Sequence, residues 1–411
     1  MEPDAALAGV KVVDLTQTLA GPWCTQVLAS LGADVVKLER LPAGDEARRA
    51  GPPFWEGESA LFLAANSGKR SLAVDLKSAA GREAALRLVE GADVFVQSLR
   101  PGAADRLGLG FDDVRGRNDR VVYCSVGAFG KRGPRAEEPG YDPLMQAAAG
   151  IMSTTAEPGR RPIRTGPSAV DIGTGMWAVI GILGALLRRD AVGAAQLVDT
   201  SLYETAVNYQ PMQFAGYLAS GIVPPPLGRA QRVLVPLEVF AATDGELMVA
   251  AASDRLFGAL CAAVEMPGLA DDPRFRTNSD RVENHAALSR VLGERFAERT
   301  LDEWSTRLRA AGVPAAPVST IDEVVADEQF RALGLLQELP HPEIDDLRLV
   351  APPLSIDDRR LPLRWAAPQL GEHSREVLAE VGYSAAEVEG LEREGAIGLH
   401  TGSSSTGGGK R

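Results

Sequence analysis

The run that decides the fold is Val10-Lys-Val-Val-Asp-Leu-Thr-Gln-Thr-Leu-Ala-Gly-Pro22, which has the pattern of a buried strand, a tight turn and the start of a helix. Proline is favourable early in a helix because its missing backbone N–H would have no partner there. The helix is expected to extend to Leu31, and the apolar run 33–39 predicts a second strand. The turn lacks the Gly-x-Gly-x-x-Gly pattern of dinucleotide-binding folds, so a nicotinamide-dependent dehydrogenase of the usual kind is disfavoured.

Strand and helix signals continue to alternate through the first part of the chain. Further strands are predicted at 72–76, 92–97 and 120–126. A helix at 80–90 is expected to begin after Ser78 as its N-cap and to end at Gly91. This alternation is typical of a mainly parallel sheet covered by helices on both faces. We therefore predict an α/β protein with a Rossmann-like large domain.

The pattern changes after residue 200, where a smaller α+β domain is predicted to follow. A hairpin that turns at Asp244-Gly245 is expected near its start, and helices follow the hairpin. Short strands and two helical runs near the end are expected to return to the large domain. The predicted organisation is a large domain of residues 1–200 plus 345–398, a linker 201–227, a small domain 228–330, a second linker 331–344 and a disordered tail 399–411.

Composition excludes several classes of protein. The 411 residues are 45% hydrophobic, enough for a large core, and a net charge of -12 argues against a general nucleic-acid-binding protein. Three cysteines and four histidines show no metal-ligand spacing, so neither a zinc site nor a disulfide framework is expected. No signal peptide and no apolar run of about 18 residues is apparent, which predicts a cytoplasmic protein without membrane contact.

Asp171 lies between a loop rich in proline, glycine and arginine and an apolar helix that runs to Arg188. A carboxylate at a helix N-terminus meets the positive end of the helix dipole and unpaired backbone N–H groups. Its small neighbours Ser168, Ala169 and Gly173 cannot shield it. Two interpretations follow: an ordinary N-cap, which is the commoner role of aspartate there, or a catalytic carboxylate.

Basic residues recur just after predicted strands, at Arg40, Lys77, Arg100 and Arg106. The carboxyl ends of parallel strands share one edge of a sheet, which is the usual ligand crevice. Several cations converging there would suit an anionic phosphate ligand. Taken singly, each is equally well read as a solvated surface charge.

Together these runs resemble the family III CoA-transferases, a group that includes formyl-CoA, carnitine and dicarboxylate CoA-transferases and the homologous α-methylacyl-CoA racemases. The resemblance extends over residues 8 to about 397. It rests on Asp14-Leu-Thr-Gln-Thr-Leu-Ala-Gly-Pro, Gly32-Ala-Asp-Val-Val-Lys-Leu-Glu-Arg, Asn66-Ser-Gly-Lys-Arg-Ser-Leu-Ala-Val-Asp-Leu-Lys, Arg100-Pro-Gly-Ala-Ala-Asp-Arg-Leu-Gly, Gly140-Tyr-Asp-Pro-Leu-Met-Gln, the segment around Asp171, and the later runs Asp272-Pro-Arg-Phe, Gly312-Val-Pro-Ala-Ala-Pro-Val and Gly371-Glu-His.

The resemblance implies a role for each matching residue. Asp171 matches the nucleophile of the family. The residues that match contacts to CoA, its phosphates or the thioester are Gln17, Leu19, Ala20, Arg40, Lys77, Ser98, Leu99, Arg100, Arg106, Tyr141 and Asp142. The resemblance also implies that two ring-like protomers interlock as a homodimer. CoA and acyl-CoA would be substrates, with no tightly bound cofactor and no metal.

The implied reaction moves CoA from an acyl-CoA thioester to an acceptor carboxylic acid through an aspartyl-CoA thioester. The wording of the motifs favours succinyl-CoA as donor and a dicarboxylate as acceptor, but the sequence does not name the acids. Backbone N–H groups from Gly173 to Gly175, with Gln17, are candidates to bind the oxyanion. Arg160, Arg161 and Arg164 either bind a distal carboxylate or form a solvated basic loop.

Two alternatives remain beside the transferase. A 2-methylacyl-CoA racemase needs two acid–base groups near neutral pH, and racemases of the family carry a histidine where this chain has Tyr141. An ordinary tyrosine, with a pKa of about 10, is a poor base at neutral pH, so the racemase is disfavoured. The second alternative is a non-catalytic CoA-binding protein, which would bind CoA without forming a covalent adduct at Asp171.

Overall fold

The computed structural model describes residues 5–226, 228–230 and 233–400. Its largest sheet has the strand order β16-β5-β2-β1-β6-β7-β8, in which every neighbouring pair is parallel except β16 with β5. The strands are β1 (Lys11–Leu15), β2 (Asp34–Arg40), β5 (Lys69–Val74), β6 (Val94–Gln97), β7 (Val122–Gly127), β8 (Gln196–Ser201) and β16 (Ile397–Gly398). The predicted α/β class with a mainly parallel sheet is confirmed.

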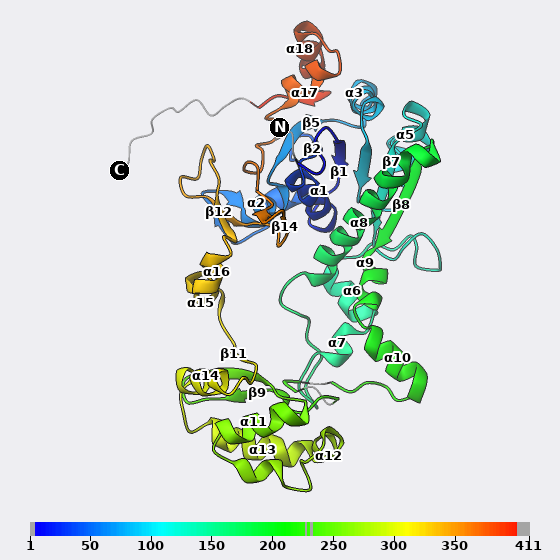
Figure 1. Cartoon of the computed structure of the whole chain (residues 1–411). Helices are drawn as coiled ribbons and strands as arrows, with labels where there is room; N and C mark the ends of the chain where they lie inside the picture. The colour runs from blue at the N-terminus through cyan, green and yellow to red at the C-terminus, as the bar shows by residue number, and fades with distance from the viewer. Residues whose placement is uncertain (1–4, 227, 231–232, 401–411) are drawn as a thin grey trace. The chain divides into compact units, whose positions relative to one another are not determined.

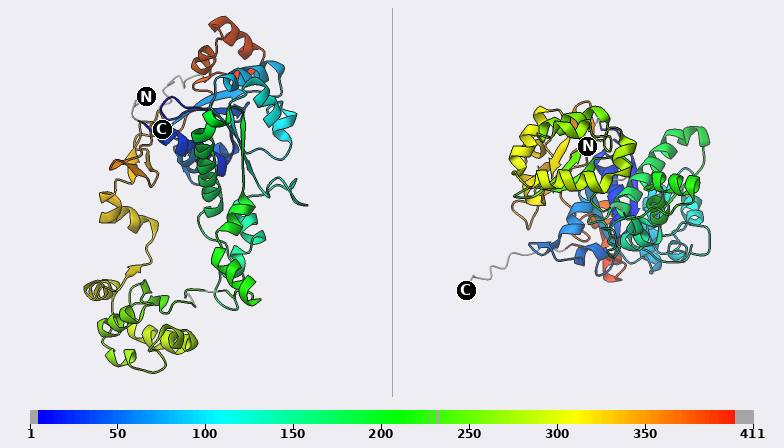
Figure 2. Two further views of the ribbon diagram at one scale, coloured as in Figure 1. Left: turned by 45° about the vertical axis from the view of Figure 1, so that its right-hand side comes forward. Right: turned by 90° about the horizontal axis from the view of Figure 1, so that it is seen from below.

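Helices cover both faces of this sheet. On one face, apolar side chains of β1, β2 and β5 pack against α3 (Ala79–Glu90), α5 (Phe111–Arg117), α17 (Ser374–Glu380) and α18 (Ala385–Arg393). On the other face lie α1 (Ala20–Ser30) and α8 (Ala169–Val192), which pack side by side (Figure 1, Figure 2). The caps of α3 agree with the sequence, because Ser78 Oγ accepts the Gly81 N–H and Gly91 ends the helix.

The prediction that no apolar run is long enough to span a membrane is wrong for α8. This helix has 24 residues and contains an 18-residue window of mean hydropathy 1.8, so by length and composition it can cross a membrane. However, 44% of that window is buried inside the protein, and the helix packs against α1, β7 and β8. These contacts are those of a core helix in the α/β unit.

The described chain divides into two compact units. The first contains residues 5–149, 166–211 and 331–400, and the second contains 150–165, 212–226, 228–230 and 233–330. Part of the expected linkers therefore belongs to the first unit. In the first linker, α9 (Leu202–Asn208) packs against α8, and in the second, Leu339 and Ile344 pack beside α2 (Ala60–Asn66). Residues 401–411 of the expected tail lie outside the described residues.

The second unit is built on a small antiparallel sheet of β9 (Leu237–Ala241), β10 (Glu246–Ala250) and β11 (Ala315–Pro317). The hairpin of β9 and β10 turns at Asp244-Gly245, as its sequence predicts. Its core is rich in aromatic residues. Helices α11 (Asp254–Ala263), α12 (Asn278–Glu283), α13 (His285–Phe296) and α14 (Leu301–Ala310) pack around Phe240, Phe257, Phe296 and Trp304.

Candidate active site

A cavity of about 470 Å³ opens at the carboxyl ends of β1, β6 and β7, within the first unit. The chain runs from β1 outward to β2 and β5, and then returns to build β6, β7 and β8 on the other side of β1. The cavity therefore lies where the strand order reverses, which is the place where open parallel sheets bind ligands. Ten of the twelve residues that the sequence assigned to the site line it: Gln17, Leu19, Ala20, Arg40, Ser98, Leu99, Arg100, Arg106, Tyr141 and Asp171.

Two expected site residues are not among those that line the cavity. Asp142 is only 2% exposed and its carboxylate contacts backbone rather than the cavity. Lys77 follows β5 at the same edge of the sheet, and its expected contact with CoA stays a prediction. Conversely, Glu46 lines the cavity although the sequence did not single it out, because it lies on a short helical turn, Glu46–Arg49, that shows no apolar periodicity.

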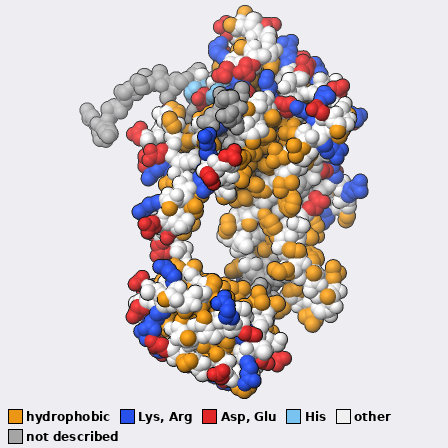
Figure 3. All heavy atoms as spheres, in the orientation of Figure 1, with side chains coloured by type: hydrophobic (Ala, Val, Ile, Leu, Met, Phe, Trp, Pro, Cys, Tyr) orange, Lys and Arg blue, Asp and Glu red, His pale blue; other side chains and the backbone are white. Residues whose placement is uncertain are grey.

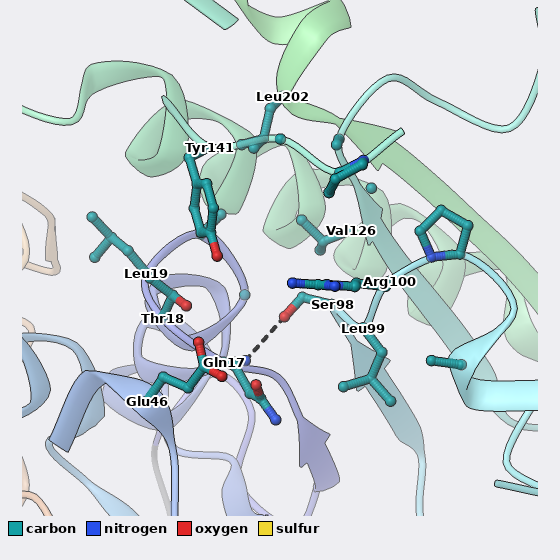
Figure 4. Close-up of a pocket in the computed structure, with 18 of the residues that line it drawn as sticks. Gln17, Thr18, Leu19, Glu46, Ser98, Leu99, Arg100, Val126, Tyr141 and Leu202 are labelled. Carbon is teal, nitrogen blue, oxygen red and sulfur yellow. Dashed lines mark hydrogen bonds between the residues drawn. The ribbon is translucent and has the colours of Figure 1, made fainter. Parts of the chain in front are cut away.

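The turn after β1 is shaped by hydrogen bonds from other segments instead of by glycines. The backbone N–H of Gln17 donates to Ser98 Oγ at 3.0 Å, which joins the turn to the end of β6 (Figure 4). Thr18 has a φ of 71°, an uncommon conformation for a residue with a side chain. Its backbone N–H donates to Asp45 Oδ1 at 3.0 Å. Asp45 therefore holds a turn whose positive φ strains a threonine but would not strain a glycine.

A buried ion-pair network of Asp14, Lys37, Asp45 and Lys69 lies directly beneath this turn. The Lys37 ammonium is 2.9 Å from Asp45 Oδ2 and donates to the carbonyl oxygen of Thr16 at 2.9 Å. Lys69 lies 3.1 Å from Asp14 Oδ2. Burial alone would raise the pKa of Asp14, but the two lysines offset it, so the pKa of Asp14 lies below its ordinary value. The turn that lines the cavity is thus supported by a paired set of buried charges.

Asp171 lies in the first turn of α8 and is not its N-cap. The N-cap is Ser168, whose side chain makes no capping hydrogen bond. Burial, followed by the nearby carboxylate of Asp142, raises the pKa of Asp171 to about 7. A carboxyl group whose pKa lies near neutrality, in a cavity, has the properties of a functional group rather than of a capping residue.

Tyr209 holds the same turn of α8 from a second side. Its hydroxyl donates to the carbonyl oxygen of Ala169 at 3.1 Å. A side chain at Gly173 would place its Cβ 1.5 Å from the Tyr209 hydroxyl oxygen, so only glycine fits there. The expected oxyanion role of Gly173 to Gly175 does not suit this geometry. These residues lie beyond the first three N–H groups of α8, inside the ladder of helical hydrogen bonds.

The cavity carries both signs of charge. Arg40, Arg100 and Arg106 line it, and Glu46 lies opposite Arg100 (Figure 4). Arg40 and Glu46 form an ion pair at 3.3 Å whose side chains are about half exposed. Tyr141 and Arg100 point into the same part of the cavity (Figure 4). The excess of cations suits an anionic ligand that displaces Glu46 from Arg40.

The arginines before α8 belong to the second unit. Arg160, Arg161 and Arg164 lie within residues 150–165, whereas Asp171 lies in the first unit. The Arg164 guanidinium donates to the carbonyl oxygen of Thr165 at 3.0 Å. Their role toward a distal carboxylate therefore stays a prediction.

Comparison with known proteins defines the class that this fold and site represent. The family described as CoA-transferase family III matches residues 7–374, and the chain belongs to this family. It is a CoA-transferase, as the sequence motifs predict.

Three relatives and one solved structure show how similar the chain is to known members. A succinyl-CoA:glutarate CoA-transferase of Mus musculus is 34% identical over 96% of this chain and 91% of its own length. A succinate–glutarate CoA-transferase of Agrobacterium fabrum is 35% identical over 91% and 95%. A succinyl-CoA:mesaconate CoA-transferase of Haloarcula hispanica is 35% identical over 92% and 96%. A crystal structure of a CAIB/BAIF family protein from Brucella suis has a TM-score of 0.82 at 39% identity, covering 91% of this chain and 99% of that one.

Substitutions of Arg40 and of Glu46 are expected to change the affinity for CoA in opposite directions. Arg40→Ala should weaken CoA binding by about 1–3 kcal/mol, because a charge-assisted contact to a phosphate is lost. Glu46→Gln should strengthen it by a few-fold, because the competing carboxylate is removed from the cavity. Isothermal titration with CoA at two salt concentrations measures both effects.

Arg120→Ala is the matched control, since Arg120 pairs with Asp190 on the surface and does not line the cavity. Equal affinities for all three variants would refute a phosphate role for Arg40.

Proposed function

We propose that this protein transfers CoA from an acyl-CoA thioester, with succinyl-CoA as the donor, to a dicarboxylic acid through an aspartyl-CoA thioester at Asp171. The observation that carries the proposal is the position of Asp171 in the cavity, with a pKa raised to about 7. The choice of acids is supported by the relatives, whose names pair succinyl-CoA or succinate with glutarate or mesaconate. The cationic side chains of the cavity suit the phosphates of CoA.

The proposed reaction begins when the Asp171 carboxylate attacks the carbonyl carbon of the donor thioester. The carbon–sulfur bond breaks, which gives a mixed anhydride and CoA thiolate. The thiolate then attacks the aspartyl carbonyl, releases the donor acid as a carboxylate and leaves CoA on Asp171. The acceptor carboxylate then attacks the aspartyl-CoA thioester, which gives a second mixed anhydride and CoA thiolate. The thiolate attacks the acceptor carbonyl of this anhydride, which forms the new acyl-CoA and releases Asp171 as a carboxylate. Thioester energy is conserved as long as water does not reach the anhydride or the enzyme-bound thioester.

The raised pKa of Asp171 suits this role. A carboxylate with a pKa near 7 is half ionised at pH 7 and is a stronger nucleophile than an ordinary aspartate, because it is less stabilised by its surroundings. The penalty arises from burial and from Asp142. Both effects diminish once the charge leaves Asp171 in the first step. The site therefore destabilises the reactant charge more than it destabilises the acyl enzyme.

Oxyanion donors are proposed at the N-terminus of α1. This helix begins at Ala20 with no side-chain cap on its first turn, and Ala20 and Gly21 both line the cavity. The first N–H groups of a helix have no partner within the helix and point toward the incoming negative charge. In this proposal the N–H groups of α1 take the oxyanion-binding role that the sequence suggested for residues 173–175.

We further propose that the protein acts in the cytoplasm as a homodimer. Support for a second copy comes from the outer face of α8, where Trp177, Ile180 and Leu187 are 45%, 54% and 90% exposed. Hydrophobic side chains gather over the helices around α1 and α8 in the orientation of Figure 1 (Figure 3). Apolar patches of this kind mark interaction surfaces. Light scattering on the purified protein gives the oligomeric state directly.

A racemase and a transferase make opposite predictions in heavy water. Tyr141 is 54% exposed at the cavity, and the residues that line it include no histidine. The histidine that a racemase would use with Asp171 as its second acid–base group is therefore not in place, and we expect no deuterium at the α-carbon of 2-methylacyl-CoA. Under the same conditions, labelled CoA should move from succinyl-CoA to glutarate. Mass spectrometry reads both products. Enzyme-dependent α-deuteration without CoA transfer would favour the racemase.

A further inference from the structure

We infer that Asp142 is a positioning residue for the nucleophile, which it holds by capping the first turn of α8 from a neighbouring helix. This inference rests on the proposed role of Asp171. Asp142 is the first residue of α6 (Asp142–Ala148) and is 2% exposed. It is not among the residues that line the cavity, so the contact with CoA that the sequence assigned to it stays a prediction.

The contacts of the Asp142 carboxylate are directed at α8. Its Oδ2 atom accepts the backbone N–H groups of Val170 at 2.8 Å and of Asp171 at 3.1 Å. These are two of the orphan donors that every helix leaves in its first turn, and Ser168 makes no side-chain bond to them. The Oδ1 atom accepts from Gln146 Nε2 at 2.6 Å. Asp142 is thus a non-local cap, fixed in turn by its own helix.

This cap restrains the backbone atoms that carry the Asp171 side chain. The N–H group of the nucleophile is bonded to Asp142 on one side, and the carbonyl oxygen of Ala169, two residues earlier, is bonded to Tyr209 on the other. Thr174 Oγ1 donates to Thr205 Oγ1 at 2.9 Å, one turn further along α8. The first turn of α8 is therefore restrained from α6 and from the α9 segment together.

The charge of Asp142 gives the contact a second consequence. Burial is the main cause of the raised pKa of Asp171, and the negative charge of Asp142 raises it further. Tyr209 is the titratable group on the neighbouring segment, and Arg40, Glu46, Arg100 and Arg106 line the same cavity. Asp142 accepts N–H bonds while it repels the second carboxylate. It therefore orients the nucleophile and keeps it poorly stabilised at the same time.

Asp142→Asn separates these two effects. The amide oxygen of asparagine can still accept the N–H groups of Val170 and Asp171, while the negative charge is lost. We expect the acid limb of the kcat/KM profile to move by about one pH unit toward lower pH, with a several-fold lower rate on the plateau because a carboxylate with a lower pKa is a weaker nucleophile. Tyr209→Phe is the matched control. It loosens the same turn without a change of charge, so it should lower kcat and leave the pH limb in place.

Asp142→Ala removes both the cap and the charge. We expect kcat to fall at least tenfold with the KM for succinyl-CoA within about twofold, and the amides of Val170 and Asp171 to exchange with deuterium at least tenfold faster. Unchanged exchange and an unchanged pH profile in both Asp142 variants would overturn the inference. A raised KM with unchanged kcat would also overturn it, in favour of a direct CoA contact. Absence of transfer by the wild-type protein would refute the proposed function alone, because the exchange of the two amides tests the cap without any substrate.

Discussion

Asp171→Asn is expected to abolish CoA transfer, with a loss of about 10⁴-fold or more in kcat. An amide cannot attack the thioester to form an anhydride, so the reaction has no covalent path. Asparagine matches aspartate in shape and the rest of the cavity is unchanged, so CoA binding should stay within about twofold. Steady-state assays with succinyl-CoA and glutarate, together with titration of CoA, give both quantities. Transfer at the wild-type rate in this variant would refute the nucleophile.

The same variant should be more stable than the wild type in alkaline solution. The folded-state pKa of Asp171, about 7, lies above the unfolded value of about 3.9. Between pH 4 and pH 7 the unfolded chain has already lost this proton, whereas the folded protein still holds it. The free energy of unfolding of the wild type therefore falls as the pH rises through this range. Asp171→Asn is free of that loss and should gain about 1–2 kcal/mol at pH 8, after allowance for the lost charge at the N-terminus of α8. The gain should vanish near pH 4, and urea unfolding at both pH values measures it.

Lys37→Met is expected to have the largest effect on stability, a loss of about 3–5 kcal/mol. The side chain of Lys37 is 0% exposed, and its loss leaves Asp45 and the carbonyl oxygen of Thr16 buried without their cation. Because Asp45 also holds Thr18, the turn that lines the cavity should loosen and CoA affinity should fall. Urea denaturation gives the free energy of unfolding.

Lys131→Met is the control for this variant. Lys131 pairs with Asp199 at 3.1 Å with 46% of its side chain exposed, and such a pair contributes less than about 1 kcal/mol. The double variant Lys37→Met, Asp45→Asn should recover part of the loss, because it removes the unpaired charge. Equal stabilities of Lys37→Met and Lys131→Met would contradict a network that supports the turn.

The sheet could be predicted from sequence because its strands are short apolar runs between helices with clear caps. The sixth parallel strand, β8, was not predicted, because the residues between its buried ends alternate between exposed and half-buried and include Asp199. The sequence placed the start of α8 at or just after Asp171, whereas the helix begins two residues earlier, at Ala169. Gly173 and Gly175 weaken the helical pattern, yet a Cβ at Gly175 would lie 2.6 Å from the carbonyl oxygen of Ala20. The glycines are there because α1 and Tyr209 approach too closely for any side chain.

The residues of the candidate site also fall into those that could be predicted from sequence and those that could not. Asp171 and the residues after β1 and β6 could be placed because the ends of parallel strands share an edge. The role of Asp142 could not, since it caps a helix that begins 27 residues later in the chain, and only the tertiary fold brings the two together. The burial of Lys37 could not be predicted either, because the sequence of an apolar strand does not show that its lysine pairs with Asp45.

The measurement that tests the central claim most directly is mass spectrometry of the protein after brief reaction with succinyl-CoA. Trypsin releases the peptide 165–188, which contains Asp171 as its only aspartate or glutamate. We expect this peptide to carry a CoA adduct that disappears when the acceptor acid is added and is absent from Asp171→Asn. Full transfer activity with no adduct on this peptide, or with an adduct on another residue, would contradict an aspartyl-CoA intermediate at Asp171.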